Sequence, residues 1–361
     1  MKEDIFENAT LPLDTARIVV AGVGGGGCNT IRHMVEHKVT GVNFLCINTD
    51  VKDLSKVSGQ EQLPIGKKRT KGLGAGGDPI EGREAAIEDR DSIAECLENT
   101  DMLFVTAGMG GGTGTGAAPI VAEIAKDMGI LTVAVVTMPF QFEGERRNTQ
   151  ATQGLGNLRE VVDSIIVIPN DKLLSNLEKN IRVREAFSRV NNVLLDSVKG
   201  ISDLITKPGE INVDFADVSS VMRGMGLCMM GIGYSNEEGA ALKAVDQALG
   251  NPLIDDMQLK GAKGILVNVT GNGDLSMLEY QQVCDRLYEC ATPESKIITG
   301  MMIDEDMEEA IKVTVVLAGI EPAAPSFSID RPTPKHQDEN DSVNGDRVFT
   351  DVPTFIRKQM D

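Results

Sequence analysis

Short apolar runs alternate with helical patterns along the first half of the chain. Runs typical of buried strands span residues 16–21, 42–47, 102–107, 131–138 and 164–168. Apolar residues at steps of three and four predict helices that begin near residue 29 and that span 80–97 and 120–128. Strands that alternate with helices predict an α/β fold with a parallel sheet. The loops after its strands would meet at one edge, where ligands of such sheets bind.

A long helical pattern follows and leads into a second α/β region. Apolar residues repeat at helical steps from Leu173 to Ile205, which predicts a central helix between two lobes. Further strands are predicted over residues 227–234, 264–269, 296–303 and 311–318, and further helices over 237–249 and 278–291. The pattern therefore predicts a Rossmann-like domain over 16–172, a central helix over 173–205 and a smaller α/β domain over 206–320.

The composition changes at both ends of the chain. Residues 321–350 are rich in Pro, Ser, Asp and Asn, which predicts a disordered linker. The last segment, 351–361, has an apolar patch beside two basic residues, which is typical of a short helix that folds into a partner's groove. Its candidate partner-binding residues are Val352, Pro353, Phe355, Ile356, Arg357 and Lys358. Residues 1–15 are acidic and lack the apolar core of a signal peptide, so we expect a flexible N-terminus.

Charge and composition limit the classes of partner. The net charge of −19 opposes attraction to nucleic acid or to an anionic membrane. Aromatic residues make up 4% of the chain and Trp is absent, which argues against stacking on bases. No apolar stretch reaches about 18 residues, so membrane insertion is not expected. Six cysteines without a C-x-x-C pair indicate reduced thiols in the cytoplasm.

A glycine-rich loop follows the strand predicted over 102–107. Residues 108–119 read GMGGGTGTGAAP and lead into a predicted helix. Glycines let backbone N–H groups approach an anion, and Thr113 and Thr115 add hydroxyl donors near the positive end of the helix dipole. The loop therefore predicts a phosphate site, with an irregular turn without ligand as the alternative. Because the chain is acidic, backbone amides and a cation must supply most of the attraction.

Two further glycine loops belong to the same half of the chain. GVGGGGCN, at residues 22–29, contains a G-x-G-x-x-G pattern of the dinucleotide-binding type. Asp50 follows the second predicted strand, where an acid would bind a ribose in a Rossmann unit. GLGAGGDP, at residues 72–79, ends with Pro79 at a predicted helix start. This part of the chain alone does not separate a nicotinamide enzyme from another nucleotide-binding protein.

Two carboxylates stand three residues apart after the central helix pattern. Asn212, Asp214 and Asp217 lie at a predicted loop-to-helix junction. Asp214 as a helix N-cap with Asp217 in the first turn is ordinary helix-start chemistry. The functional alternative is that the pair orients a water or holds a cation near a phosphate. The residues alone support the two interpretations equally.

Two other groups of residues also have a structural and a functional interpretation. Glu143 and Arg147 follow the predicted strand over 131–138, where a charged surface turn is favoured. Phe187 is more typical of a core position than of a ligand contact. Asn191, four residues further on, shares its helix face and is able to present an amide to the edge of a base.

Taken in order, these motifs resemble the tubulin/FtsZ family over essentially the whole chain. The loop over 108–119 closely matches the family's signature, which is highly specific. GVGGGGCN, GLGAGGDP, PNDKLL, NVDFADV and DVPTFIRKQMD occur in the family's order. The resemblance implies the tubulin/FtsZ fold, with a GTP-binding domain, a central helix and a smaller C-terminal domain. It also implies head-to-tail filaments in which each nucleotide is covered by the next subunit.

The resemblance implies a cytoplasmic GTPase whose polymers build the ring of cell division, with GTP as substrate and Mg²⁺ at the phosphates. Asn212, Asp214 and Asp217 fall on the loop that enters the neighbour's site, where they would act in catalysis. The segment 351–361 resembles the peptide that docks on membrane-tethering and regulatory division proteins, so membrane contact would be indirect. A non-catalytic nucleotide-binding relative is the nearest alternative, and an NAD(P)-dependent oxidoreductase is a distant one. A P-loop NTPase is excluded because the sequence has no G-x-x-x-x-G-K-[ST] motif.

The resemblance also implies which residues contact the nucleotide. Glu143 and Arg147 fall near the ribose, and Phe187 and Asn191 near guanine. The other implied contacts, from the first loop, the signature loop and the PNDKLL motif, are Gly25, Gly26, Gly27, Cys28, Asn29, Gly111, Gly112, Thr113, Gly114, Thr115 and Asn170. Cys28 occupies a place that is often Gly, Asn or Ser, and its thiol would make the loop sensitive to thiol reagents.

Overall fold

Apolar residues fill strands that lie inside a sheet. The strands are β1 (Ile18–Val23), β2 (Asn43–Asn48), β3 (Glu61–Pro64), β4 (Met102–Gly108), β5 (Leu131–Met138), β6 (Ser164–Pro169), β7 (Gly226–Ser235), β8 (Gly264–Gly271), β9 (Lys296–Ile303) and β10 (Ile311–Ala318). Every residue of β1 is buried, as expected for a strand whose sheet is covered on both faces. The structure is a computed structural model, and it describes residues 16–174, 182–254, 261–305, 307 and 310–320.

The described strands form one sheet in the order β3-β2-β1-β4-β5-β6-β7-β10-β8-β9. Neighbouring strands from β3 to β7 are parallel, β10 is antiparallel to β7 and β8, and β9 is parallel to β8. The predicted α/β fold with a largely parallel sheet is therefore confirmed. Because β1, β2 and β4 run in the same direction, the loops that follow them meet at one edge of the sheet.

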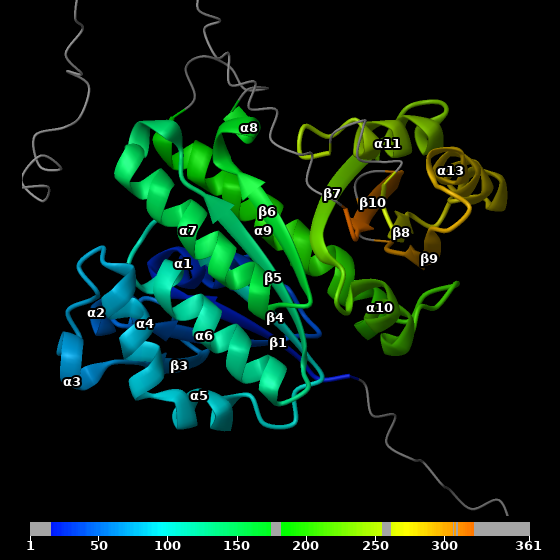
Figure 1. The fold of residues 1–361 in the computed structure, drawn as a ribbon. Helices are drawn as coiled ribbons and strands as arrows, with labels where there is room; N and C mark the ends of the chain where they lie inside the picture. The colour runs from blue at the N-terminus through cyan, green and yellow to red at the C-terminus, as the bar shows by residue number, and fades with distance from the viewer. Residues whose placement is uncertain (1–15, 175–181, 255–260, 306, 308–309, 321–361) are drawn as a thin grey trace, which may run out of the picture. The chain divides into compact units, whose positions relative to one another are not determined.

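Helices connect the parallel strands and cover both faces of the sheet (Figure 1). In the first half they are α1 (Gly24–Glu36), α2 (Val51–Leu54), α3 (Lys67–Thr70), α4 (Pro79–Glu88), α5 (Arg90–Cys96), α6 (Thr113–Asp127), the short 3₁₀ helix η1 (Gln141–Glu143) and α7 (Glu145–Val161). In the second half they are α8 (Asn170–Leu174), α9 (Val183–Thr206), α10 (Phe215–Met222), α11 (Ala240–Leu249) and α13 (Met277–Cys290).

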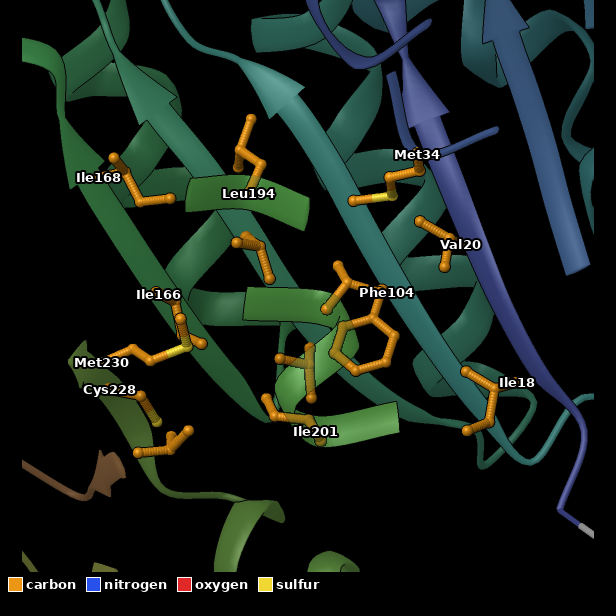
Figure 2. Packing of buried hydrophobic residues seen from close by; sticks show 14 of the residues in the cluster. Ile18, Val20, Met34, Phe104, Ile166, Ile168, Leu194, Ile201, Cys228 and Met230 are labelled. Carbon is orange, nitrogen blue, oxygen red and sulfur yellow. The ribbon is translucent and has the colours of Figure 1, made fainter. Parts of the chain in front are cut away.

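Side chains of the parallel strands alternate between two apolar cores, one on each face of the sheet. Ile18 and Val20 of β1 belong to the core that contains Leu194 of α9, and Figure 2 shows these side chains together. Val19 and Ala21 belong to the other core, with residues of α4, α5, α6 and α7. A third core joins α11 and α13 to β8 and β10. The central helix is thus held by the same core as the first strands.

Two helices begin inside the glycine loops instead of after them. α1 begins at Gly24, where the sequence predicted a start near Asn29, and α6 begins at Thr113 instead of Ile120. Glycine is unfavourable inside helices, but close packing requires it here. A Cβ on Gly116 of α6 would lie 1.9 Å from a backbone carbonyl oxygen of α4. The loops are therefore shorter than predicted, and their last residues form first turns of helices.

Three further helices differ from the prediction. α9 begins at Val183, and Arg182 before it is extended, so no continuous helix runs from Leu173. The pattern over 80–97 is two helices, α4 and α5, because the backbone leaves the helical conformation at Asp89. The sequence pattern did not predict α7, in which only Ala151, Gly154 and Leu158 are buried.

Both ends of the chain lie outside the described residues. The predicted N-terminal segment 1–15, the linker 321–350 and the partner-binding segment 351–361 therefore stay predictions. Among the helices that the structure describes, none combines the length and the apolar character needed to cross a bilayer.

Candidate functional site

A cavity of about 430 Å³ lies where the loops after β1, β2 and β4 meet. We call it the glycine cavity. Its lining includes the first turns of α1 and α6, residues 48–50 at the end of β2, and two glycines of the loop over 72–79. Of the residues predicted to contact a nucleotide, it is lined by Gly25, Gly26, Gly111, Gly112, Thr113, Gly114 and Arg147.

Two helices point their N-termini at the glycine cavity. Gly25 and Gly26 lie in the first turn of α1, and Thr113 and Gly114 in the first turn of α6. The first backbone N–H groups of a helix have no partner within the helix, and neither of these helices has a side-chain N-cap. The helix dipoles add positive potential at the same place. The cavity therefore suits an anion with several oxygen acceptors, such as a chain of phosphates.

Close approach of the backbone makes glycine necessary around this cavity. A Cβ on Gly26 would lie 3.0 Å from the backbone nitrogen of Gly108, and a Cβ on Gly114 would lie 2.7 Å from the carbonyl oxygen of Gly108. Gly110 has a φ of 93°, which side chains rarely allow. A larger residue at Gly26 or Gly114 would push the first turn of its helix away from Gly108 at the end of β4.

Two threonine hydroxyls hold the signature loop in place. The Oγ1 atoms of Thr49 and Thr113 lie 2.6 Å apart, which joins the loop after β2 to α6. The backbone N–H of Gly110 donates to Oγ1 of Thr115 over 2.8 Å. Thr115 lines neither this cavity nor the one described next. It was predicted to contact the nucleotide, but its hydroxyl stabilises the loop from within.

The glycine cavity contains two carboxylates. Asp50 and Asp53 line it, and Asp53 accepts a hydrogen bond from Asn48 over 3.2 Å and pairs with Lys56 at 2.8 Å. Arg147 is the cationic side chain in the lining. Among the described residues, no three His, Cys, Asp or Glu side chains form a group able to hold a metal ion. Because the lining is acidic, a polyphosphate would bind here together with a cation. The phosphate oxygens would supply some of the ligands of that cation.

A second cavity of about 500 Å³ adjoins the first and shares part of its lining. We call it the aromatic cavity. Residues from α1, η1, α7, α8 and α9 surround it. Of the predicted contacts, it is lined by Gly26, Asn29, Gly111, Glu143, Arg147, Asn170, Phe187 and Asn191.

Phe187 and Asn191 lie on the face of α9 that lines the aromatic cavity. The ring of Phe187 is 42% exposed and meets the buried ring of Phe140 edge-on, with ring centres 5.4 Å apart. The hydroxyl of Thr30 in α1 donates to Oδ1 of Asn191 over 3.4 Å. Phe187 is therefore a partly exposed aromatic surface beside an amide, which suits a planar base.

Asn170, the first residue of α8, provides an acceptor without a partner. Its side chain is 4% exposed, and its Oδ1 has no hydrogen-bond partner in the described structure. A buried acceptor in this state costs free energy. Asn170 lines the aromatic cavity, so a turn of its amide would bring this buried oxygen to a ligand N–H or O–H.

Glu143 and Arg147 form an ion pair that joins η1 to the first turn of α7. Glu143 is further held by the backbone N–H of Phe140, which donates to Oε1 over 3.0 Å. Arg147 lines both cavities. The pair is therefore part of the cavity wall, whereas the sequence alone favoured a charged surface turn.

Two other predicted contacts, Gly27 and Cys28, face the protein interior. A Cβ on Gly27 would lie 2.4 Å from the carbonyl oxygen of Thr106, so this glycine lets α1 pack on β4. Cys28 is 2% exposed, and its hydrogen bond with Cys46 and its burial raise the pKa of its thiol. The expectation of a reagent-sensitive loop is therefore wrong, because reactive cysteines are accessible thiolates.

The structure does not bring Asn212, Asp214 and Asp217 to either cavity of their own chain. Asp214 is the N-cap of α10, and its Oδ1 accepts the backbone N–H of Asp217 over 2.7 Å. Oδ1 of Asn212 accepts the backbone N–H of Gly209 over 2.8 Å. The helix-start interpretation is confirmed, and it leaves the other carboxylate oxygens open to a further role.

Several lining residues were not among the predicted contacts. In the glycine cavity they include Thr49 and Asp53, beside Asp50, which was singled out only as a possible ribose contact; in the aromatic cavity they include His33 and Arg184. A signal was present for the first group, because they follow the second predicted strand, whose end a parallel sheet brings to the same edge. No such signal exists for His33 in α1 and Arg184 in the first turn of α9. Only the packing of the two helices shows that these residues line the cavity.

Comparison with known proteins agrees with this site. Residues 17–178 match the Tubulin/FtsZ family, GTPase domain, and residues 226–321 match the FtsZ family, C-terminal domain. The chain is 49% identical over 355 residues to the cell division protein FtsZ of Coxiella burnetii, with 98% of this chain and 92% of that protein covered. It is 44% identical over 394 residues to the cell division protein FtsZ of Pseudomonas aeruginosa, with 99% and 100% covered.

A solved structure gives the same result. The empty FtsZ dimer of M. jannaschii superposes with a TM-score of 0.80 and 45% identity over 84% of this chain and 88% of that one. Fold, cavities and family matches define a GTPase of the tubulin type. Within that class, the chain belongs to the FtsZ family.

Proposed function

We propose that this chain is a cell-division GTPase that assembles head to tail and completes its catalytic site between adjacent subunits. One observation carries the proposal. Two adjoining cavities offer helix N-termini for phosphates and an aromatic ring with amides for a base, while Asp214 and Asp217 line neither of them. A subunit therefore holds its substrate without the carboxylates, and a second copy brings them.

The glycine cavity binds the phosphates of GTP. The first turns of α1 and α6 direct backbone N–H groups at it, and Thr113 adds a hydroxyl. Mg²⁺ fits this site, because oxygen donors are the ligands it prefers and because Asp50 and Asp53 make the lining too negative for a triphosphate alone. Phosphate oxygens and water with Asp50 or Asp53 would hold the ion, which neutralises charge on the transferred phosphate.

The aromatic cavity binds the guanosine. Phe187 offers a ring face to guanine, and Asn191 offers an amide to its edge. Asn170 accepts a hydrogen bond from a nucleotide N–H or O–H, which relieves its unpaired Oδ1. Glu143 and Arg147 line the wall near the ribose.

Catalysis follows when Asn212, Asp214 and Asp217 of the next subunit close over the phosphates. A carboxylate at this point orients the attacking water and accepts its proton. Loss of the γ-phosphate then removes contacts across the interface, so hydrolysis weakens the polymer. The dimer of the M. jannaschii relative supports assembly between copies.

Assembly takes place in the cytoplasm at the division site. The segment 351–361 binds tethering and regulatory division proteins, so the polymer reaches the membrane indirectly. Support comes from the sequence of this segment, in which an apolar patch adjoins Arg357 and Lys358 after a polar linker.

The test is the rate of GTP hydrolysis per molecule as a function of protein concentration, with light scattering read in the same cuvette. We expect hydrolysis to rise at the concentration at which scattering begins, because both need the interface. A rate per molecule that stays constant down to high dilution would show a self-contained site and overturn the mechanism. Scattering without hydrolysis would favour a non-catalytic relative.

A further inference from the structure

Four lysines lie on or directly after the short helices α2 and α3, and none of them lines the glycine cavity itself. Lys52 lies on α2, Lys67 and Lys68 lie on α3, and Lys71 follows α3 directly. We call these four residues, all of which are exposed, the basic rim. Residues 51–71 contain six Lys and Arg against two Asp and Glu, which is a local charge of +4 in a chain whose net charge is −19.

Hydrogen bonds fix the basic rim beside the cavity lining. The carbonyl oxygen of Thr49, which lines the cavity, accepts from the backbone N–H of Gly74 over 3.2 Å and from the hydroxyl of Thr70 over 3.4 Å. The backbone N–H of Val51 donates to Gly72 over 3.2 Å. α2 and α3 are therefore anchored next to the cavity, at the same end of the sheet (Figure 1).

The ammonium groups of the basic rim form no ion pairs within the described residues. Two other cations of the same segment are already paired, Lys56 with Asp53 at 2.8 Å and Arg69 with Glu81 at 3.0 Å. Carboxylates also lie beside α3, because Glu88 accepts the backbone N–H of Lys68 over 3.1 Å and Asp89 accepts that of Gly66 over 2.6 Å. The rim therefore offers ammonium groups that form no ion pair with a described side chain, and nearby acids offset only part of their charge.

The loop before α10 carries the opposite charge. Glu210 and Asp214 are exposed, Asp217 is half-buried, and none of these acids forms a salt bridge within the described residues. Lys207, the cation nearest in sequence, is paired with Asp203 at 3.0 Å. We call residues 209–217 the acidic loop.

Approach of the acidic loop to a loaded glycine cavity is repulsive without added positive charge. The triphosphate is an anion, and Asp50 and Asp53 of the lining are acidic as well. We infer that the basic rim binds the acidic loop of a second copy of this chain and supplies the charge that lets the loop close over the nucleotide. The inference rests on the proposed head-to-tail assembly and adds the residues that attract the next subunit. Because the rim is exposed, salt screens this attraction.

The test compares two double variants that change the net charge equally. Lys67→Glu with Lys68→Glu reverses the rim, and Lys126→Glu with Arg159→Glu is the matched control. Lys126 and Arg159 are exposed near the C-terminal ends of α6 and α7. α6 is 15 residues long and begins at the cavity, so Lys126 lies about 20 Å away.

The quantity measured is the concentration at which GTP hydrolysis per molecule begins to rise. We expect the rim variant to raise this threshold at least about tenfold over the matched control at about 0.1 M salt. The difference should nearly vanish at about 1 M salt, because the Debye length falls from about 10 Å to about 3 Å. Adding Glu210→Lys to the rim variant should lower the threshold part of the way back, since it changes the charge of the acidic loop from −3 to −1 and lets the new lysine face the new glutamates.

A second variant, Lys71→Gly, tests the rim without destabilising the fold. Lys71 has a φ of 53°, in the region that favours glycine. Lys71→Gly removes one rim charge while it relieves the backbone, so we expect a higher threshold without loss of stability.

Three outcomes would overturn the inference while the wild type keeps its threshold. They are a rim variant that matches its control, a threshold that Glu210→Lys leaves unchanged, and weaker binding of fluorescent GTP by the unassembled rim variant. The last outcome would assign the rim to the nucleotide. A wild type without a threshold would instead overturn the proposed function, and the inference with it.

Discussion

The side-chain hydroxyls of Thr49 and Thr113 lie 2.6 Å apart and join the loop after β2 to the first turn of α6. Both residues are buried and both line the glycine cavity. The contact therefore holds the N-terminus of α6 against the loop that follows β2. Each residue follows a different strand, and the parallel sheet brings the two loops together.

Replacing Thr49 with Val tests this contact. The variant leaves the Thr113 hydroxyl buried without its partner, so we expect the free energy of unfolding to fall by about 1–3 kcal/mol. GTP affinity should fall as well, because Thr113 is freed to move. Urea unfolding and GTP titration measure the two effects. Thr152→Val, at an exposed hydroxyl of α7, is the control and should change stability by less than about 0.5 kcal/mol. Equal effects of both variants would show that the contact contributes nothing.

Two glycines in helices should respond in opposite ways to alanine. A Cβ on Gly27 would lie 2.4 Å from the carbonyl oxygen of Thr106, whereas a Cβ on Gly156 in α7 meets nothing within 4 Å. We expect Gly27→Ala to lower the free energy of unfolding by about 1–3 kcal/mol through overpacking. Gly156→Ala should raise it by about 0.5–1 kcal/mol, because alanine favours the helix. Chemical denaturation checks both, and a neutral Gly27→Ala would contradict the packing argument.

The same glycines explain where the sequence was a poor guide to the fold. Apolar runs predicted the strands well. The sheet is covered on both faces, so every residue of a strand such as β1 is buried and the apolar run is continuous. Glycine weakens a helix signal, so the starts of α1 and α6 were placed too late. α7 was missed because Gly154, which packs against Thr115, stands where an apolar residue would normally mark the buried face. β3 was missed because it is a short edge strand with exposed Glu61.

The candidate site was predictable as far as a motif marks it. The glycine loops and Asp214 as an N-cap are local features, so the sequence identified them. Which side of a residue faces a cavity is a tertiary property. For that reason Cys28 and Thr115 were included although they face inward, and Asp53 was left out although it lines the glycine cavity.

The unpaired amide oxygen of Asn170 predicts a separation of stability and binding. Asn170→Leu removes a buried acceptor that has no partner in the free chain, so we expect little change in the free energy of unfolding. GTP loses a hydrogen bond, so its affinity should fall about 10- to 100-fold, a cost of about 1.4–2.8 kcal/mol. Discrimination against ATP should fall too if the donor is on the base. Denaturation and nucleotide titration of the unassembled chain measure these effects, and unchanged GTP affinity would remove Asn170 from the site.

Asp214→Asn separates the two roles of this residue. Asparagine caps helices as well as aspartate does, so α10 keeps its start while the carboxylate is lost. We expect kcat to fall at least about 100-fold, with GTP affinity of the unassembled chain unchanged because Asp214 lines neither cavity. At a GTP concentration that leaves the Asn170→Leu cavity mostly empty, mixing the two variants should restore hydrolysis above the sum of the two, since some interfaces then combine an intact cavity with an intact carboxylate. A normal kcat would show that Asp214 only caps the helix, and lost GTP affinity would assign it to its own subunit's site.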